Sequence, residues 1–286
     1  MGYTLGIIGG SGLYAIDGLT DVRELTVDTP YGSPSDSVVE GKLGDTRLLF
    51  LPRHGRGHRL APHAINYRAN VCALKQLGAT HLVTVSAVGS MREDIAPGHL
   101  VVPDQFIDLT KRRISTYFDE GVVSHVAFGD PVCDLTAKAL AAAAERAGGT
   151  VHRGGTYVCI EGPAFSTRAE SFLYRSWGVA VIGMTAMPEA RLAREAELPY
   201  AVLSLATDYD SWHASEADVN VEAVVATLTK NVSLARQTIA QLAGALPDPT
   251  KSRAVNAARS GIMTHPDAIG RDARRKLDWL LGTAAS

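Results

Sequence analysis

HLVTVSAV, residues 81–88, is an apolar run rich in β-branched residues, as in a strand that is buried on both faces of a sheet. Residues 64–77 precede it, with Val71, Leu74 and Leu77 near helical spacing and Gly78 as a residue that can end the helix. A further short apolar run follows at residues 100–103. A buried strand with a helix close before it indicates an α/β fold.

The same alternation of apolar strands and helices extends from this stretch in both directions. The further strands that we expect are residues 3–8, 46–51, 156–160, 179–184 and 200–206. The further helices that we expect are residues 132–147, 167–177, 188–197 and 219–243. Such an order predicts one sheet covered by helices on both faces, in a single domain over residues 1–246.

The composition shifts at residues 246–249, which read LPDP. Beyond them lie one short helical stretch and a basic one at residues 272–281. Residues 247–286 are too few to hold a core of their own. We therefore expect a C-terminal helical extension that packs on the core or on the active site.

Composition excludes several classes of protein. The net charge of −2 gives no general attraction for nucleic acid, and no run approaches the 18 apolar residues of a membrane span. The first residues lack the pattern of a signal peptide, so we expect a cytoplasmic protein. Cys72, Cys133 and Cys159 show no metal-binding spacing, and we predict buried thiols and no metal.

Two loops after strands could bind an anion. Residues 9–12, GGSG, could cradle phosphate with backbone amides, or be a plain tight turn. Residues 10–15 also match the GxGxxA fingerprint of dinucleotide-binding proteins, but turn residues follow where that fingerprint needs a helix. The basic segment at residues 53–59, RHGRGHR, is either a local anion site or a solvated loop.

Polar residues follow the other predicted strands. Ser86, Thr185, Asp208 and Asp210 all lie at or just after strand ends, where ligands gather in open α/β sheets. Together with the two loops they describe a site for phosphate, a polyol and a nitrogenous base. In the loop at residues 161–168, Thr167 could equally cap a helix and Phe165 could belong to the core.

Residues 5–243 resemble the 5'-methylthioadenosine phosphorylases, a family of the trimeric purine nucleoside phosphorylase superfamily. The resemblance is carried by ordered blocks that read GIIGGSGL, TPYGSPS, FLPRHGRGH, NYRANVCALKQLG, SAVGS, PDQFID, EGPAFSTRAES, MTAMPEA and ATDYDSW. It implies the nucleoside phosphorylase fold, with a central mixed, largely parallel twisted sheet. The segment ARSGIMTHPDAI in the extension is also similar to tails of bacterial members.

The resemblance assigns roles to individual residues. For phosphate it implies Ser11, Arg53, His54, Ser86, Ala87 and Thr185, and for catalysis at the base Asp208 and Asp210. It places Met184 under the ribose, and Phe165 and Ser166 at the purine. His125 would reach the 5' group from a neighbouring subunit. The 5' pocket would be walled by Val219, Val221, Val224 and Val225, which could equally be ordinary helix core.

The activity that the resemblance implies is phosphorolysis of 5'-deoxy-5'-methylthioadenosine to adenine and 5-methylthioribose 1-phosphate, with phosphate as co-substrate and no cofactor. A homotrimer, or a dimer of trimers, is expected. Alternative substrates are methylthioinosine, 6-oxopurine nucleosides and 5'-halogenated 5'-deoxyadenosine. An NAD-dependent oxidoreductase and a non-catalytic nucleoside-binding module remain as hypotheses from other classes.

Overall fold

The computed structural model describes residues 2–10, 12–213 and 221–282. Within them lies one sheet of eleven strands. The strands are β1 (Thr4–Gly9), β2 (Thr20–Leu25), β3 (Val38–Leu43), β4 (Thr46–Pro52), β5 (His81–Ser90), β6 (Leu100–Val102), β7 (Gln105–Asp108), β8 (Val151–Arg153), β9 (Thr156–Cys159), β10 (Val181–Gly183) and β11 (Tyr200–Asp208).

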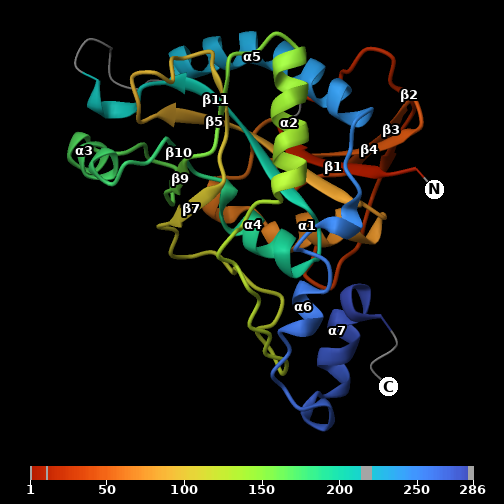
Figure 1. Ribbon diagram of the computed structural model, residues 1–286. Helices are drawn as coiled ribbons and strands as arrows, with labels where there is room; N and C mark the ends of the chain where they lie inside the picture. The colour runs from red at the N-terminus through yellow and green to blue at the C-terminus, as the bar shows by residue number, and fades with distance from the viewer. Residues whose placement is uncertain (1, 11, 214–220, 283–286) are drawn as a thin grey trace.

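The sheet is mixed and largely parallel, as expected. At its centre β5 lies parallel to both β1 and β11, and β1 is parallel to β4. Beyond β5 the direction reverses, because β10 runs antiparallel to the last residues of β5. The carboxyl ends of β1, β4, β5 and β11 therefore meet at one edge of the sheet, where β10 also passes (Figure 1).

Helices cover both faces of the sheet (Figure 1). The helices α1 (Tyr67–Gln76) and α4 (Ala186–Glu195) pack on one face, and α2 (Asp134–Arg146) and α5 (Val221–Ala243) pack on the other. A third, smaller cluster holds α3 (Arg168–Ser176) against the end of β10. Buried apolar residues of the central strands, such as Leu82 and Val83, alternate between the two main clusters, which explains why these strands are apolar throughout.

The expected strands and helices are present, with ends shifted by a few residues. Four strands were missed: β2, β3, β7 and β8. They are short or polar, and β2 has mainly exposed side chains, so they lack the apolar signal that marks β5. β2, β7 and β8 lie at edges of the sheet and pair with one strand each, and β3 lies next to an edge, between β2 and β4.

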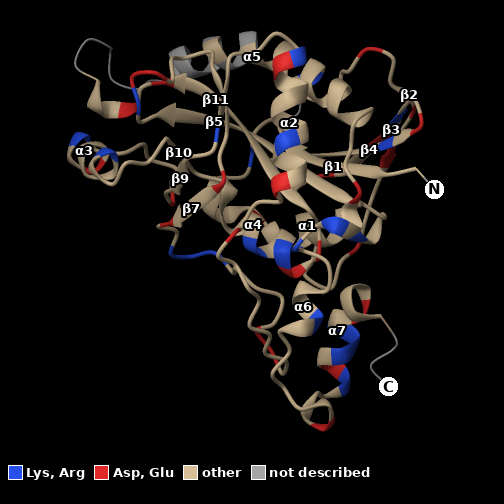
Figure 2. Ribbon diagram, viewed as in Figure 1, with Lys and Arg blue, Asp and Glu red and all other residues tan. Residues whose placement is uncertain are grey.

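The extension contains α6 (Ala257–Ser260) and α7 (Arg271–Leu281). They pack below α1 and α4, away from the edge where the strands end (Figure 1). The ring of Trp279 lies 4.9 Å from that of Tyr117 and 6.2 Å from that of Tyr31. Basic and acidic residues occur along α7 (Figure 2), and several of them are exposed, while its Leu277 and Leu280 are buried. The extension thus docks through one amphipathic face.

In the described part of the chain, no helix combines the length and apolarity that crossing a bilayer requires.

Candidate active site

A cavity of about 480 Å³ lies at the edge where the parallel strands end. This volume is in the range of small-molecule sites. The predicted site residues that line it are Arg53, His54, Ser86, Ala87, Phe165, Ser166, Met184, Thr185, Asp208 and Asp210. Eight of them form two groups, which we call the arginine end (Arg53, His54, Ser86 and Thr185) and the aspartate end (Phe165, Ser166, Asp208 and Asp210).

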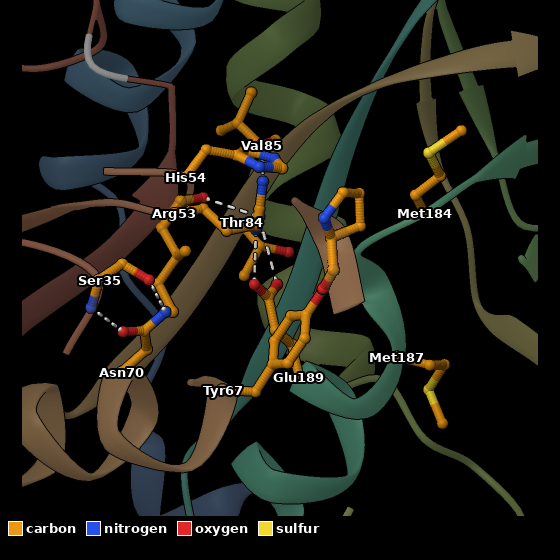
Figure 3. A network of polar contacts seen from close by, with 12 residues as sticks. Ser35, Arg53, His54, Tyr67, Asn70, Thr84, Val85, Met184, Met187 and Glu189 are labelled. Carbon is orange, nitrogen blue, oxygen red and sulfur yellow. Dashed lines mark hydrogen bonds and ion pairs between the residues drawn. The ribbon is translucent and has the colours of Figure 1, made fainter. Parts of the chain in front are cut away.

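Arg53 follows β4 and is almost completely buried. Its Nε donates to Oε1 of Glu189 at 2.6 Å, and Nη2 donates to Oε2 of the same carboxylate at 3.2 Å (Figure 3). Nη1 donates to the Val85 carbonyl and Nη2 to the Ile8 carbonyl, at 3.0 and 3.2 Å. Burial lowers the pKa of Arg53, but Glu189 more than offsets this, so the pKa lies above its ordinary value. The guanidinium is charged and held from three sides.

His54 lies next to Arg53 and stacks on His58, with ring centroids 4.2 Å apart. Its Nδ1 is 2.8 Å from the Leu60 carbonyl, which can only accept, so Nδ1 carries a proton. Burial, with the charge of Arg53 as a smaller cause, lowers the pKa of His54 to about 4. The ring is therefore neutral at pH 7, and Nε2 keeps its lone pair for another partner.

Two hydroxyls complete the arginine end. The oxygens of Ser86 and Thr185 are buried and form no hydrogen bond of ordinary geometry among the described residues, although Ser86 lies close enough to the buried Tyr157 hydroxyl to affect its pKa. Buried polar atoms normally have a partner, so these two fit a polar ligand such as phosphate. Gly10 and Gly12 line the same end, while Ser11 lies outside the described residues. Residues 12–19 contain turns and no helix, so the GxGxxA match lacks the context of a dinucleotide site.

The aspartate end holds two buried carboxylates. Oδ2 of Asp208 accepts from Thr207 Oγ1 at 2.7 Å, and Oδ1 accepts from the backbone N–H of Asp210 at 2.8 Å. Burial raises the pKa of Asp208 and also that of Asp210. A side chain at Gly89 would meet Asp208 Oδ1 at 3.0 Å, so glycine at the end of β5 makes room for the carboxylate.

Asp210 has a backbone φ of 51°, in the left-handed region that few non-glycine residues adopt. Its Oδ2 and the Ser166 hydroxyl are buried and form no hydrogen bond of ordinary geometry among the described residues, although the Ser166 and Ser171 side chains lie close enough to the carboxylate to lower the pKa that burial raises. Strained backbone and unpaired polar atoms at one place are typical of a ligand site. The aspartate end therefore offers acceptors and a hydroxyl to a polar heterocycle.

The loop before α3 contains two residues, Thr167 and Phe165, for which the sequence left a structural role open. Thr167 caps α3 in a capping box with Glu170, so its role is structural. Phe165 lines the cavity with 42% of its side chain exposed, so it does not belong to the core. Met184 lines the cavity directly after β10.

Sequence reasoning missed two residues behind the cavity, Glu189 and Arg113. Arg113 is buried and donates to the carbonyls of Met184, Met187 and Glu161 at 2.6 to 2.7 Å. It thus fixes the segments that follow β9 and β10. Its partners lie 48 to 74 positions away in the chain, so no local pattern could have indicated them. Glu189 stands inside the quoted block MTAMPEA, but its pairing with Arg53 is equally non-local.

Some predicted residues do not meet the cavity or cannot be placed. His125 donates its backbone N–H to Gly261 and does not line the cavity of its own chain. Val219 lies outside the described residues, and the side chains of Val221, Val224 and Val225 on α5 are likewise not described. Val232, further along α5, lines the cavity and was not predicted. No described residue of the extension lines it either.

The described residues contain no group of three or more His, Cys, Asp or Glu side chains that could hold a metal ion.

Comparisons with known proteins agree with this geometry. Residues 4–244 match the family model described as phosphorylase superfamily. The S-methyl-5'-thioadenosine phosphorylase of Geobacter sulfurreducens is 55% identical over 285 residues, which cover 99% of each chain. That of Hyperthermus butylicus is 51% identical over 87% of this chain and 91% of its own length.

Solved structures show the same similarity. A methylthioadenosine phosphorylase from an Antarctic soil metagenomic library has a TM-score of 0.92 and 46% identity, covering 98% of this chain and 99% of its own. The methylthioadenosine phosphorylase of Schistosoma mansoni in complex with adenine has a TM-score of 0.85 and 38% identity, covering 91% of this chain and 99% of its own.

Proposed function

This chain belongs to the phosphorylase superfamily, among the S-methyl-5'-thioadenosine phosphorylases, and we propose that it cleaves 5'-deoxy-5'-methylthioadenosine with inorganic phosphate. The products are adenine and 5-methylthioribose 1-phosphate. The observation that carries the proposal is a single cavity whose two ends differ in chemistry. The arginine end suits an oxyanion, and the aspartate end suits a purine with hydrogen-bond donors.

Phosphate binds at the arginine end. The remaining N–H of Arg53, the hydroxyls of Ser86 and Thr185, and the backbone at Ala87 surround it there. When the C1'–N9 bond breaks, the ribose becomes an oxocarbenium-like cation. The phosphate dianion stabilises this cation and then forms the new bond to C1'. No covalent enzyme intermediate and no metal or other cofactor is needed.

The purine takes the electron pair of the C1'–N9 bond and must not leave as a free anion. Asp208 donates a proton, or a strong hydrogen bond, to N7 and so neutralises the leaving base. Its raised pKa, caused by burial, favours the protonated form that this step requires. Asp210 lies next to it, near the Ser166 hydroxyl, and orients the base.

The aspartate end favours a 6-aminopurine over a 6-oxopurine. Adenine has an acceptor at N1 and a donor at its amino group, so the Ser166 hydroxyl can donate to N1, directly or through water. Asp208 can donate to N7 with one oxygen and accept from the amino group with the other. Hypoxanthine would place its O6 against an acceptor. Methylthioadenosine is therefore a better substrate than methylthioinosine.

A phosphate-dependence assay tests the function. Incubation with methylthioadenosine should release adenine only when phosphate is present. A non-catalytic binding module would retain the nucleoside and release nothing in either case. A panel with methylthioinosine, inosine and a 5'-halogenated 5'-deoxyadenosine then identifies the preferred nucleoside. Release of adenine without phosphate would contradict the proposal.

We further propose a homotrimer in which His125 reaches the 5' group of a neighbouring subunit. Exposed apolar side chains in two places support it. Phe172 and Leu173 lie on α3 and Phe165 lies just before it at the cavity, whereas Val123 and Met263 are joined by a backbone hydrogen bond. Contact between different surfaces of neighbouring copies is a heterologous interface, which closes into a ring when the rotation permits. A monomer with full activity would exclude this assembly.

The extension belongs to the same proposal. Ile262 forms a β-bridge with Ser124, and Met263 donates its N–H to the Val123 carbonyl. The extension thus braces the segment that carries His125. Truncation at Pro247 should raise KM for the nucleoside more than it lowers kcat, because binding shared by ground and transition states would be lost. Steady-state kinetics on the truncated chain, with light scattering for its oligomeric state, measure this. Unchanged kinetics would contradict it.

The assembly as a trimer or a dimer of trimers, and a cytoplasmic location, remain predictions.

A further inference from the structure

Glu189 is the most deeply buried carboxylate near the cavity, yet it does not line it. Its side chain is fully buried on α4, and both carboxylate oxygens face Arg53 (Figure 3). Placing a charge there is costly unless it is paired, and Arg53 is the residue that pairs with it. A buried ion pair often adds little to the stability of a protein. The role of this pair therefore lies in its effect on Arg53 and the arginine end.

The donors of Arg53 show what the pair leaves for a ligand. A guanidinium has five N–H groups. Glu189 takes two of them, and the carbonyls of Val85 and Ile8 take one each. One N–H on Nη1 remains. Arg53 therefore offers phosphate a single fixed hydrogen bond, with its charge largely compensated from behind.

We propose that Glu189 is a positioning residue that limits the charge of Arg53 toward phosphate, so that bound phosphate keeps the negative charge that stabilises the ribosyl cation. This rests on the function proposed above. A fully charged, unpaired arginine would hold phosphate more tightly but would weaken its attraction for the cation. Glu189 thereby weakens the binding of phosphate in the ground state and lowers the activation barrier for cleavage of the C1'–N9 bond.

The neighbouring groups are consistent with this role. The neutral His54 adds no charge at the arginine end. Arg113, the other buried arginine nearby, is itself paired with Glu161 at 3.0 Å. The arginine end thus binds with fixed donors rather than with excess positive charge.

The Glu189→Gln variant tests the proposal, because it removes the charge and keeps the size. We expect KM for phosphate and kcat to fall together, each by about tenfold, as one nearby charge is no longer compensated. A purely structural role would instead loosen Arg53 and raise KM for phosphate. An unchanged or higher KM for phosphate overturns the proposal.

Glu195→Gln is the matched control. Glu195 is also buried on α4, but it accepts from Thr116 and the Tyr117 backbone, away from the cavity. This variant should leave KM for phosphate unchanged. Thermal denaturation of both variants measures how much stability is lost when a buried glutamate on α4 is replaced by glutamine.

A double variant keeps the test open if Glu189→Gln does not fold. In Arg53→Gln alone, the buried Glu189 carboxylate faces phosphate, and KM should rise by about 100-fold or more. Arg53→Gln/Glu189→Gln replaces the pair by two neutral amides, which buried sites tolerate better than an unpaired charge. We expect its KM for phosphate to lie about tenfold below that of Arg53→Gln, because the unpaired carboxylate is gone, and above that of wild type, because the Arg53 hydrogen bond is lost. A KM equal to that of Arg53→Gln overturns the proposal.

Failure of the proposed function has a different signature. If wild-type protein releases no adenine in the presence of phosphate, the function itself is wrong. Wild type could be a phosphate-dependent enzyme while Glu189→Gln shows no joint decrease in KM for phosphate and kcat, or the double variant shows no recovery in KM for phosphate. In that case only the role of Glu189 is wrong.

Discussion

The two ends of the cavity are built in opposite ways. At the arginine end, Arg53 is held by Glu189 and two carbonyls, so its remaining donor is fixed in advance, and the Leu60 carbonyl fixes the orientation of the neutral His54 ring. At the aspartate end, burial leaves Asp208 and Asp210 with raised pKa values, and Phe165 is half exposed on a loop. Fixed donors suit an ion that is the same in every turnover. Buried acids suit a group whose charge changes during the reaction.

The largest expected effect tests whether the aspartate end selects its base. Wild-type protein should use methylthioadenosine better than methylthioinosine by about 10⁴ in kcat/KM, because the 6-oxo group leaves buried polar atoms unpaired. Both nucleosides are assayed at saturating phosphate. Similar values for the two would show that the aspartate end does not distinguish the bases.

The next effect concerns the proton. Asp208→Asn keeps the shape of the side chain and should lose about 10²–10⁴ in kcat on methylthioadenosine, the usual range for a lost general acid. It should also relax the preference toward 6-oxopurines, because an amide can donate to O6. Kinetics on both nucleosides, with circular dichroism to check the fold, measure this. An Asn variant with full activity would remove Asp208 from the mechanism.

Two serines allow the ends to be compared directly. Ser86 and Ser166 each have a buried hydroxyl that forms no hydrogen bond of ordinary geometry among the described residues, one at each end. Ser86→Ala should raise KM for phosphate by about 10-fold to 100-fold, as expected for a hydrogen bond to a charged group. Ser166→Ala should raise KM for the nucleoside, by less, since its partner is neutral.

Each serine variant is the control for the other. The proposal requires that each one changes the KM of its own substrate and leaves that of the other nearly unchanged. If both variants change both constants alike, the cavity does not have two separate ends.

The sequence predicted more of the fold at its centre than at its margins. β5 and β11 are apolar because both of their faces are covered, so their sequences alone identify them as strands. In β2 the side chains are mainly exposed, and β8 is only three residues long, so each depends on its partner strand for its order.

The candidate site shows the same limit. Arg53, His54 and Asp208 follow strands and belong to compact sequence blocks, so they could be assigned from the sequence. Glu189 lies 136 positions from Arg53, and this pairing exists only when α4 packs on the sheet, where it contacts β5 and β11. Residues that contact a ligand can be read from local patterns, whereas residues that hold them in place depend on the tertiary structure.

The smallest expected effect is on the free energy of unfolding. Its pH dependence should have opposite signs for the arginine end and the aspartate end of the cavity. Burial lowers the pKa of His54 to about 4, against about 6.5 in an unfolded chain. Between these values the unfolded chain binds a proton that the folded protein does not, so the contribution of His54 is complete above pH 6.5 and is lost as pH falls toward 4. Partial solvent screening reduces it to the order of 1 kcal/mol. His54→Gln should therefore flatten the rise of the unfolding free energy over this interval, as measured by urea denaturation at several pH values.

His81 is the matched control for this experiment. It is buried away from the cavity, and burial also lowers its pKa to about 4. His81→Gln should flatten the rise of the unfolding free energy over the same pH interval but leave KM for phosphate unchanged, whereas His54→Gln should change both quantities.

Asp208→Asn should change the pH dependence of the unfolding free energy with the opposite sign. A carboxyl whose pKa is raised by burial contributes stability at low pH, and this contribution is lost as pH rises through that pKa. The Asn variant should therefore gain stability over wild type as pH increases. If His54→Gln leaves the pH profile as it is in wild type, the folded protein protonates His54 freely, and the neutral His54 ring does not distinguish the arginine end from the aspartate end.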